Sequence, residues 1–306
     1  MAPREFEAAA AHLAMLVFAF LVSSSFTVGD AIADAIEPAA LMFLRFLLAV
    51  TIFLAILLVR GPRLATPRPV DVARYGWLAL LLVVFFVTMF EGLRLTSALN
   101  AGAVFTLVPP MTAIISLLVF GQRLSLGESV TLLVAGGAAL WVLTGGRMAG
   151  LGGFSIGAGE AIYFIGCVSY AAYSPSVRLF RGSESLVELT FWTLVFALVL
   201  LALYGWRAIL GTDWRSLSLL VYLGIAHLAL FCTAISFYLI QFASTRLPSA
   251  KVMAYTYLIP AFVVVQKVVL GAPWPAWPVL AGVGVITSAM IVLQRGPARL
   301  RRGEEA

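Results

Sequence analysis

The sequence predicts an all-helical integral membrane protein with ten transmembrane helices and both termini in the cytoplasm. Hydrophobic residues make up 62% of the 306 residues and charged residues only 11%, whereas soluble domains hold roughly 45–50% and about 25%. Apolar stretches of about 20 residues, the length that crosses a bilayer, recur from one end of the chain to the other. The net charge of +6 comes largely from arginines in the short loops between these stretches, which membrane topology explains better than nucleic-acid binding does.

Each expected span is an apolar run bounded by turn formers or by charges. The loops at 60–63 (Arg-Gly-Pro-Arg) and 271–275 (Gly-Ala-Pro-Trp-Pro) are typical. The first run has Glu5 and Glu7 in its flank and is too long for a signal peptide, so it counts as the first span. In chain order the spans are expected at 11–28, 39–59, 75–93, 98–120, 127–145, 158–177, 186–204, 217–240, 249–270 and 276–294.

The distribution of positive charge predicts the orientation of the chain. Lys and Arg are several times more frequent in the loops on the side of the N-terminus than in the loops on the other side. The positive-inside rule places the richer side in the cytoplasm. An even number of spans returns the C-terminus to the same side. The poorer side holds only Arg94, Arg147, Arg207 and Arg215.

A proline recurs at the same depth in two spans that lie half a sequence apart, Pro109 in the fourth and Pro260 in the ninth. Proline lacks a backbone donor and clashes with the carbonyl one turn earlier, so both helices are expected to be kinked near the membrane midplane. The recurrence predicts two repeats of five helices, 1–147 and 148–306. Because five is odd, the repeats must lie in opposite orientations, and inverted repeats place a shared site between their interrupted helices.

Several motifs resemble those of one known family. They are the segment PAALMFLR at 38–45 in the second span, Thr-Ser-Ala at 96–98, Pro109, and GQRLS at 121–125. With them, nearly the whole chain resembles the EamA-type transporters of the drug/metabolite transporter superfamily, which consist of two inverted five-helix repeats. Within that superfamily the chain looks most like the YddG-type exporters of aromatic and other neutral amino acids. The resemblance implies a multi-pass protein of the bacterial inner membrane that exports small solutes.

Polar and aromatic side chains recur at helical spacing on one face of several spans. Because polar groups are costly in hydrocarbon, these faces are expected to line a cavity inside the bundle. Alternatively, the tyrosines belong to an interfacial belt and the serines bond to their own backbone. Aromatic walls with a few polar groups suit a small, partly apolar solute, or a cation over a ring. The expected cavity residues are Ser24, Tyr163, Tyr170, His227, Tyr238, Gln241, Tyr255 and Tyr257, and the expected hinges are Pro109 and Pro260.

Few charged residues lie within the spans. Arg45, Glu91, Glu160 and Lys267 are all expected toward the non-cytoplasmic side of the membrane. One interpretation is a cluster of ion pairs that closes an outer gate. The other is that these side chains extend to the membrane interface.

The sequence predicts no cofactor, no metal site and no nucleic-acid partner; the partners expected are the lipid bilayer and a small solute, and no obligate protein partner is evident. Cys167 and Cys232 are expected to be buried apolar residues. The pattern G-x-S-x-G at 153–157 lacks the strand-turn-helix setting of a nucleophile elbow. Without an ATP-binding phosphate loop, the leading expectation is secondary transport by alternating access. Export of other metabolites or cationic drugs is the alternative, and an intramembrane enzyme would need a catalytic set that cannot be placed in this chain.

Overall fold

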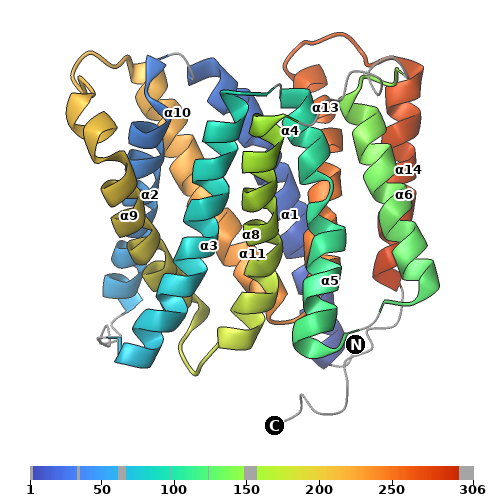
Figure 1. Ribbon diagram of the computed structural model, residues 1–306, viewed down its shortest axis with the longest axis horizontal. Coiled ribbons are helices and arrows are strands. Elements are labelled where there is room, and N and C mark those ends of the chain that lie inside the picture. The colour runs from blue at the N-terminus through green and yellow to red at the C-terminus, as the bar shows by residue number, and fades with distance from the viewer. Residues whose placement is uncertain are drawn as a thin grey trace.

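The computed structural model describes residues 3–32, 35–60, 67–96, 98–122, 124–147 and 157–295. Within these ranges the regular structure is helical, and the helices stand side by side in one bundle (Figure 1). Two short elements are not α-helical: η2, Leu230–Ile235, is a π-helix and η3, Tyr255–Tyr257, is a 3₁₀-helix. The α-helices are α1 Pro3–Ile32, α2 Pro38–Arg60, α3 Pro69–Leu93, α4 Ala98–Phe105, α5 Val108–Phe120, α6 Leu126–Leu143, α8 Ala158–Phe180, α9 Leu186–Gly211, α10 Leu219–Ala229, α11 Ser236–Ser244, α12 Ser249–Ala254, α13 Leu258–Val269 and α14 Trp277–Arg295.

Two of these helices begin at the same local signal in the sequence, a serine three residues before a glutamate. At the start of α6 the backbone N–H of Glu128 donates to the Ser125 hydroxyl (3.2 Å), and the backbone N–H of Ser125 donates to the Glu128 carboxylate (2.8 Å). Ser185 and Glu188 repeat both bonds at the same distances at the start of α9. This reciprocal pairing satisfies donors that the first turn of a helix leaves free.

Nine helical segments in the described ranges are long and apolar enough to cross a membrane, and they overlap nine of the ten expected spans. The remaining expected span, 158–177, lies in α8, which is continuous but falls short of the same apolar criterion because it holds more glycine, serine and tyrosine. Helix α8 packs against α3, α5 and α11, so its polar side chains face other helices. Ten membrane crossings therefore stay a prediction. Helix α1 begins and α14 ends at the bottom of Figure 1, as an even number of crossings requires.

Both expected helix interruptions are present. Helix α4 ends at Phe105, and α5 begins at Val108 with Pro109 and Pro110 in its first turn. In the second half, η3 separates α12 from α13, and Pro260 lies in the first turn of α13. A proline cannot donate to the carbonyl four residues earlier, so the regular ladder of hydrogen bonds ends one turn before it. The π-helix between α10 and α11 contains no proline and was not expected from the sequence.

Helices of one half of the chain pack against helices of the other half, and exchanging the two halves gives the same set of helix pairs. Helix α3 lies along α8, while α1 lies along α10 and α11; α2 packs on α9, α5 on α12 and α6 on α14. In Figure 1 the α6–α14 pair stands at the right of the bundle and the α2–α9 pair at the left. Phe46 of α2 packs edge-to-face on Phe86 of α3 and on Phe237 of α11, with ring centroids 5.8 and 5.9 Å away.

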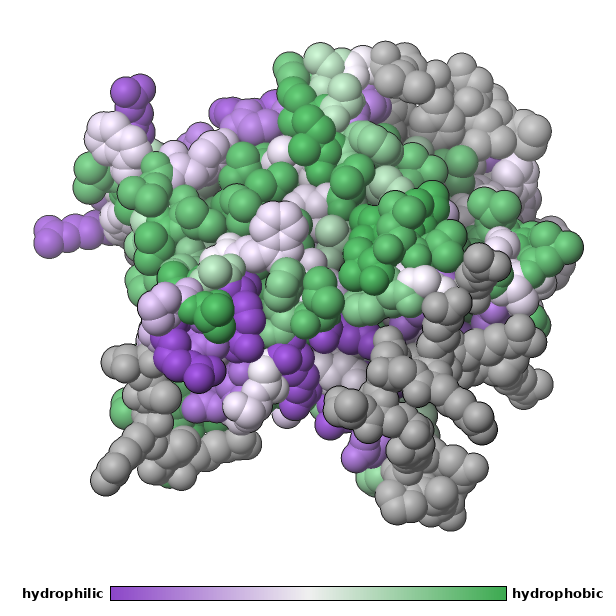
Figure 2. Space-filling view, turned by 60° about the horizontal axis from the view of Figure 1, so that its bottom comes forward, coloured by the Kyte–Doolittle hydropathy of each residue, from purple (hydrophilic) through white to green (hydrophobic). Residues whose placement is uncertain are grey.

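Apolar side chains cover the sides of the bundle. Figure 2 shows them across the side of the molecule, with hydrophilic side chains gathered toward the bottom end of Figure 1. Leu58, Leu118 and Leu203 are 69%, 78% and 70% exposed. Apolar surface on this scale is unfavourable in water and fits contact with lipid.

Glycines bring α3 and α8 into close contact. A Cβ atom at Gly159 of α8 would lie 2.9 Å from the carbonyl oxygen of Gly92 and 2.9 Å from the carbonyl carbon of Leu95. Both of these are backbone atoms, which cannot rotate away as a side chain can. Only glycine allows the two helices to lie this close at Gly159.

We expect Gly159→Ala to lower the melting temperature of the detergent-purified protein, because the added methyl group would overlap the backbone of Gly92 and Leu95, at and just after the end of α3. Overpacking of this kind costs about 1–3 kcal/mol. Gly76→Ala on α3 is the control, since a Cβ atom there has nothing within 4 Å and alanine favours the helix. Equal melting temperatures for the two variants would contradict the close contact.

Candidate functional site

One hydrogen bond joins the two interrupted helices. The hydroxyl of Tyr257 in η3 donates to the carbonyl of Thr106, between α4 and α5, at 3.0 Å. The Thr106 carbonyl lacks its helical partner because the residue four positions later, Pro110, has no N–H. When the halves are aligned on Pro109 and Pro260, Thr106 and Tyr257 both stand three residues before the proline. The bond therefore connects equivalent points of the two halves.

A glycine of α6 makes room for Tyr257 at this crossing. A Cβ atom at Gly136 would lie 2.9 Å from the Tyr257 hydroxyl oxygen and 3.3 Å from ring atom Cζ. At the next residue, Gly137, a Cβ atom would have nothing within 4 Å. Tyr257 is only 2% exposed, so α6 covers the crossing directly.

The interrupted helix of the second half is also held to α1. The Tyr255 hydroxyl lies 2.9 Å from Nδ1 of His12, and Gln266 of α13 donates to the Ser23 hydroxyl at 2.8 Å. The expected cavity residues Tyr255 and Tyr257 are thus neighbours on one short element, and each makes a bond to the first half. Their hydroxyl groups have partners inside the protein.

Aromatic rings from α3, α4 and α8 stack on one another. Tyr170 lies 4.4 Å from Phe85, 6.0 Å from Phe105 and 6.5 Å from Tyr173, measured between ring centroids. Tyr163 is 6.1 Å from Phe85. Tyr163 and Tyr170 are 5% and 6% exposed, which places them inside the bundle rather than in an interfacial belt. Their role in solute binding stays a prediction.

Gln241 is fully buried, and both ends of its amide have partners. Its Oε1 accepts from the Thr190 hydroxyl at 2.6 Å, and its Nε2 donates to the Tyr173 hydroxyl at 2.9 Å. This network joins α8, α9 and α11. Tyr238, also on α11, is half-buried and stacks on Phe242 with ring centroids 6.5 Å apart.

Ser24 and His227 meet across α1 and α10. The Ser24 hydroxyl lies 2.9 Å from Nε2 of His227 and 3.4 Å from the sulfur of Cys232, and the Cys232 thiol donates to the carbonyl of Leu21 at 3.1 Å. His227 is half-buried, with its ring 4.9 Å from that of the exposed Phe231. Ser24 and His227 therefore lie together where α1 meets α10.

Arg45 is buried where α2 meets the π-helix η2. Its Nη2 donates to the carbonyl of Cys232 at 2.7 Å, and its Nε donates to the hydroxyl of Thr233. Its Nη1 lies 4.0 Å from the sulfur of Met42, and the guanidinium lies 5.5 Å from the centre of the Phe86 ring. A π-helical turn departs from the regular hydrogen-bond ladder and is often found at functional sites. Here it presents a carbonyl and a hydroxyl to an arginine of the other half.

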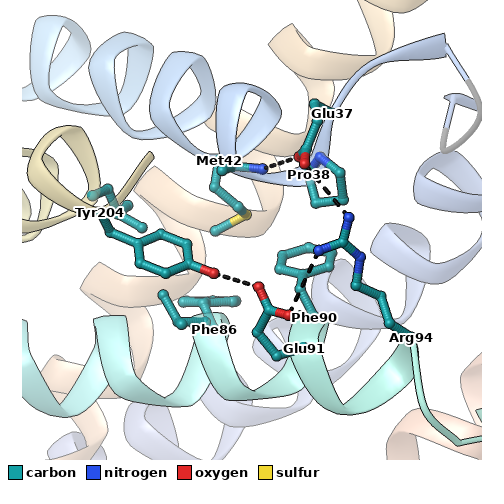
Figure 3. Close-up of a pocket in the computed structure, with 11 residues that line it drawn as sticks. Glu37, Pro38, Met42, Phe86, Phe90, Glu91, Arg94 and Tyr204 are labelled. Atoms are coloured by element: carbon teal, nitrogen blue, oxygen red, sulfur yellow. Dashed lines mark hydrogen bonds and ion pairs between the residues drawn. The ribbon is translucent and has the colours of Figure 1, made fainter. Parts of the chain in front are cut away.

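A recess lies between α2, α3 and α9, and two of its lining side chains, Met42 and Phe86, also contact Arg45 (Figure 3). Figure 3 shows a chain of polar contacts across it: Tyr204 donates to Glu91 at 2.5 Å, and Arg94 lies 3.6 Å from Glu91 and 3.7 Å from Glu37. The remaining lining is mostly apolar and consists of Pro38, Ala39, Met42, Phe86, Val87, Phe90 and Leu201.

A gate formed by the charged residues within the spans stays a prediction. Among Arg45, Glu91, Glu160 and Lys267, all of which the structure describes, no two form an ion pair. Arg45 and Glu91 have the partners given above, and Glu160 accepts from the backbone N–H of Gly157 at 2.8 Å, where it caps α8. Each of these three side chains bonds to a donor or acceptor that lies nearer than the other members of the set. The Lys267 side chain is exposed, which fits the alternative of reaching the membrane interface.

The end of the bundle away from the recess is tied between the halves. Arg74 of α3 lies 3.1 Å from Asp71 and 3.0 Å from Glu184, which stands between α8 and α9. Trp77 of α3 donates to the Ser176 hydroxyl of α8 at 3.0 Å. Helix α3 begins at the bottom of Figure 1, the end at which α1 also begins.

Sequence reasoning missed several residues of these sites. Thr106 could have been found, because Pro110 removes the donor for its carbonyl and so calls for a partner from elsewhere. His12 lies in a stretch with little else that is polar, and Phe85 lies in an apolar span where nothing distinguishes it. Thr233 lies next to Arg45 because of the π-helix, and no residue pattern in the sequence predicts that helix.

We expect Gly136→Ala to lower the melting temperature, because the methyl group displaces the Tyr257 hydroxyl and leaves the Thr106 carbonyl unpaired. An unpaired buried carbonyl costs about 1–3 kcal/mol. Tyr257→Phe should cost a similar amount, and the double variant should lose less than the sum of the two, since both remove the same bond. Gly137→Ala is the matched control. Fully additive losses, or equal effects of the two glycine changes, would contradict this role for Gly136.

Comparison with known proteins places the chain in a family. A protein of Bacillus subtilis (strain 168), the uncharacterized transporter YyaM, is 21% identical over 286 residues, which are 92% of this chain and 94% of that protein. A solved structure described as "Crystal structure of protein" has the same fold, with a TM-score of 0.78, 20% identity and coverage of 96% of this chain and 99% of its own. The pattern of the EamA-like transporter family matches residues 9–144 and again residues 157–294, so the chain belongs to the EamA-like transporter family.

Proposed function

We propose that the protein is a secondary transporter that exports small solutes across the bacterial inner membrane, with aromatic and other neutral amino acids as the first candidates. Membership of the EamA-like transporter family supports a membrane transporter. The observation that carries the mechanism is the hydrogen bond from Tyr257 to Thr106 between two interrupted helices. Interrupted helices in corresponding positions of two halves are typical of the binding region of secondary transporters.

The proposed architecture is a pair of inverted repeats, 1–147 and 148–306. The exchange of helix partners between the halves supports it, since α3 on α8 corresponds to α1 on α10 and α11. The contact between Thr106 and Tyr257 supports it independently. Two residues at equivalent positions of two related halves meet only near the axis that relates them. In the proposed architecture the pseudo-two-fold axis passes through the crossing of the interrupted helices.

The proposed cycle is alternating access around this crossing. In the present conformation the halves are tied at one end by Arg74 and Glu184 and by Trp77 and Ser176. The recess lies toward the other end of the bundle, at the start of α2 and the end of α3. With the termini in the cytoplasm, as the positive charges predict, this is a state closed toward the cytoplasm.

The chemistry of the interior favours a partly aromatic solute. The stacked rings of Phe85, Phe105 and Tyr170 offer faces and edges on which another ring can pack. The hydroxyl and imidazole groups of Ser24 and His227 offer a small number of hydrogen bonds. Sites with aromatic walls and a few polar groups bind small solutes that have one apolar part and a few polar groups.

Counterflow in proteoliposomes tests the proposal. Vesicles loaded with one unlabelled solute are diluted into the same labelled solute, and uptake against the labelled gradient is followed. The panel contains aromatic amino acids, leucine, threonine, aspartate and tetraphenylphosphonium. We expect exchange of the aromatic and other neutral amino acids. Exchange of tetraphenylphosphonium alone would favour export of cationic drugs, and exchange of no member would contradict the proposed function.

We expect Pro110→Ala and Pro260→Ala to leave the protein folded and to slow counterflow. Each change restores an N–H to the helix, so the carbonyl of Thr106 or Thr256 regains its helical donor and the interruption is weakened. A change of about 1 kcal/mol in the relative energy of two states gives about a fivefold change in rate. The same result is expected for Pro109→Ala, since Pro109 is the hinge that the sequence predicts in the first half.

Pro69→Ala is the control for these variants. Pro69 stands at the first position of α3, where the missing N–H has no partner within the helix in any case. Its replacement should change neither folding nor counterflow. If Pro109→Ala, Pro110→Ala and Pro260→Ala also exchange solute at the wild-type rate, the helix interruptions have no part in transport.

A further inference from the structure

Arg45 carries a positive charge that the described part of the chain does not neutralise with a carboxylate. The residue is 7% exposed and lies within the candidate span Pro38–Val59. Its partners are the carbonyl of Cys232, the hydroxyl of Thr233 and the sulfur of Met42, none of which is charged. A buried charge is costly unless it is paired, and an arginine inside a membrane span marks a functional site by default. Arg45 therefore has the properties of an anion-binding group without its anion.

The free capacity of Arg45 lies on the side of the recess. Two of its contacts, Met42 and Phe86, also line the recess, so one thioether and one ring separate the guanidinium from that space. The sulfur of Met42 is a weak acceptor, and at 4.0 Å it holds Nη1 poorly. Methionine is also the most adaptable of the apolar side chains. Rotation of Met42 would expose Nη1 to a solute in the recess.

The rim of the recess favours a cation, whereas Arg45 favours an anion. It holds two carboxylates, Glu37 and Glu91, and one guanidinium, Arg94, which lies near both. The Arg94 side chain is 62% exposed, so solvent screens its charge. The rim therefore keeps one excess negative charge and favours an ammonium group. A dianion such as a phosphate ester would meet two carboxylates there, and a simple cation would leave Arg45 unpaired.

The spacing suits the two charges of one small molecule. Phe86, which lies against Arg45, and Glu91 are five residues apart on α3, a rise of about 7.5 Å. Both residues line the recess, so one small molecule lying along this stretch of α3 would have its carboxylate near Arg45 and its ammonium near Glu91. The rings of Phe90 and Tyr204 and the side chain of Leu201 complete an apolar wall.

We propose that the recess between α2, α3 and α9 binds an α-amino acid as its zwitterion. The carboxylate pairs with Arg45 after Met42 has turned aside, and the ammonium pairs with Glu91. The side chain packs against Phe90 and Leu201. This site rests on the proposed transport function, because it names the solute class and the place where the solute waits on the non-cytoplasmic side. It is separate from the crossing at Tyr257 and Thr106.

The test measures occupancy of the recess without relying on transport. A single cysteine, Val87→Cys, places a thiol in the recess, and the two native cysteines are buried. The rate at which a maleimide labels this thiol in the full-length purified protein is measured with phenylalanine, 3-phenylpropionate or phenethylamine. These share one side chain but carry both charges, the carboxylate only, or the ammonium only. Ser216→Cys, in the loop before α10, is the control thiol.

We expect phenylalanine to slow labelling of Val87→Cys most, 3-phenylpropionate less and phenethylamine least, with no effect on Ser216→Cys. Protection by phenethylamine equal to that by phenylalanine would overturn the carboxylate site, and so would the absence of protection by phenylalanine. Either result leaves the transport proposal standing if counterflow is observed. Protection without counterflow of any solute in the panel would support the site and overturn the proposed transport.

Variants of Arg45 and Glu91, made in addition to Val87→Cys, test which residue binds each charge of the solute. Arg45→Gln should raise the half-protecting concentration of phenylalanine and of 3-phenylpropionate by at least about 30-fold. Glu91→Gln should weaken phenylalanine to the level of 3-phenylpropionate and leave the latter unchanged. Arg207→Gln on α9, whose guanidinium lies over the Trp206 ring, is the matched loss of charge and should change neither value. Equal protection in the wild type and in Arg45→Gln would overturn the assignment of Arg45.

Arg45→Gln also loses its bonds to η2, so two variants keep the test informative if it does not fold. Arg45→Lys retains the charge without the planar fork that binds a carboxylate at two points, and should weaken 3-phenylpropionate. Met42→Ala leaves Arg45 intact and uncovers Nη1, so it should strengthen protection by 3-phenylpropionate. Unchanged protection in both would overturn the proposal.

Discussion

A backbone carbonyl that has lost its helical donor cannot stay unpaired in the interior of a membrane bundle, and this constraint organises the centre of the protein. No water is available there to replace the missing bond. Pro110 removes the donor for the carbonyl of Thr106, and the Tyr257 hydroxyl replaces it. For that hydroxyl to reach its place, α6 must have no side chain at Gly136. A tight turn of 3₁₀-helix, η3, presents Tyr257 to the first half and Tyr255 to α1.

The same principle operates a second time with the roles of the halves reversed. The π-helix η2 of the second half presents the carbonyl of Cys232, which accepts from Ser236 at 2.8 Å and from Arg45 of the first half at 2.7 Å. In both places an irregular backbone in one half is completed by a side chain of the other. The two halves are therefore joined by specific polar bonds at depth, as well as by apolar packing, which in lipid provides little preference for one helix contact over another.

Much of the fold could be predicted from the sequence, because hydropathy and proline act locally. The apolar runs predicted nine helices that are candidate membrane spans, with some ends several residues away, and the two prolines predicted where helices would break. The polar stripe of the sixth expected span indicated interior positions for Tyr163 and Tyr170, which are buried, while their place in a solute cavity stays a prediction. Tyr173, on the same helix, is fully buried, and its hydroxyl accepts from Gln241.

The partners of the charged residues could not be predicted, because they depend on how helices rotate against one another. Arg45 and Glu91 lie toward the same side of the membrane in sequence terms, yet the π-helix gives Arg45 a carbonyl and a hydroxyl, and Tyr204 reaches Glu91 first. Spacing along one helix says which residues share a face. It does not say which face of a distant helix will meet them, and a single π-helical turn is enough to change the answer.

The hydrogen bond between Tyr257 and Thr106 bears on the direction of the proposed cycle. If both halves carried the same residue three positions before the proline, exchanging their conformations in the proposed cycle would keep the same hydrogen bond at this contact. Here one half carries a tyrosine and the other a threonine. Threonine is too short to return the bond that Tyr257 makes. In the proposed cycle the two ends would therefore differ in the hydrogen bond of one hydroxyl group, and this difference would favour one end before any solute or gradient acts.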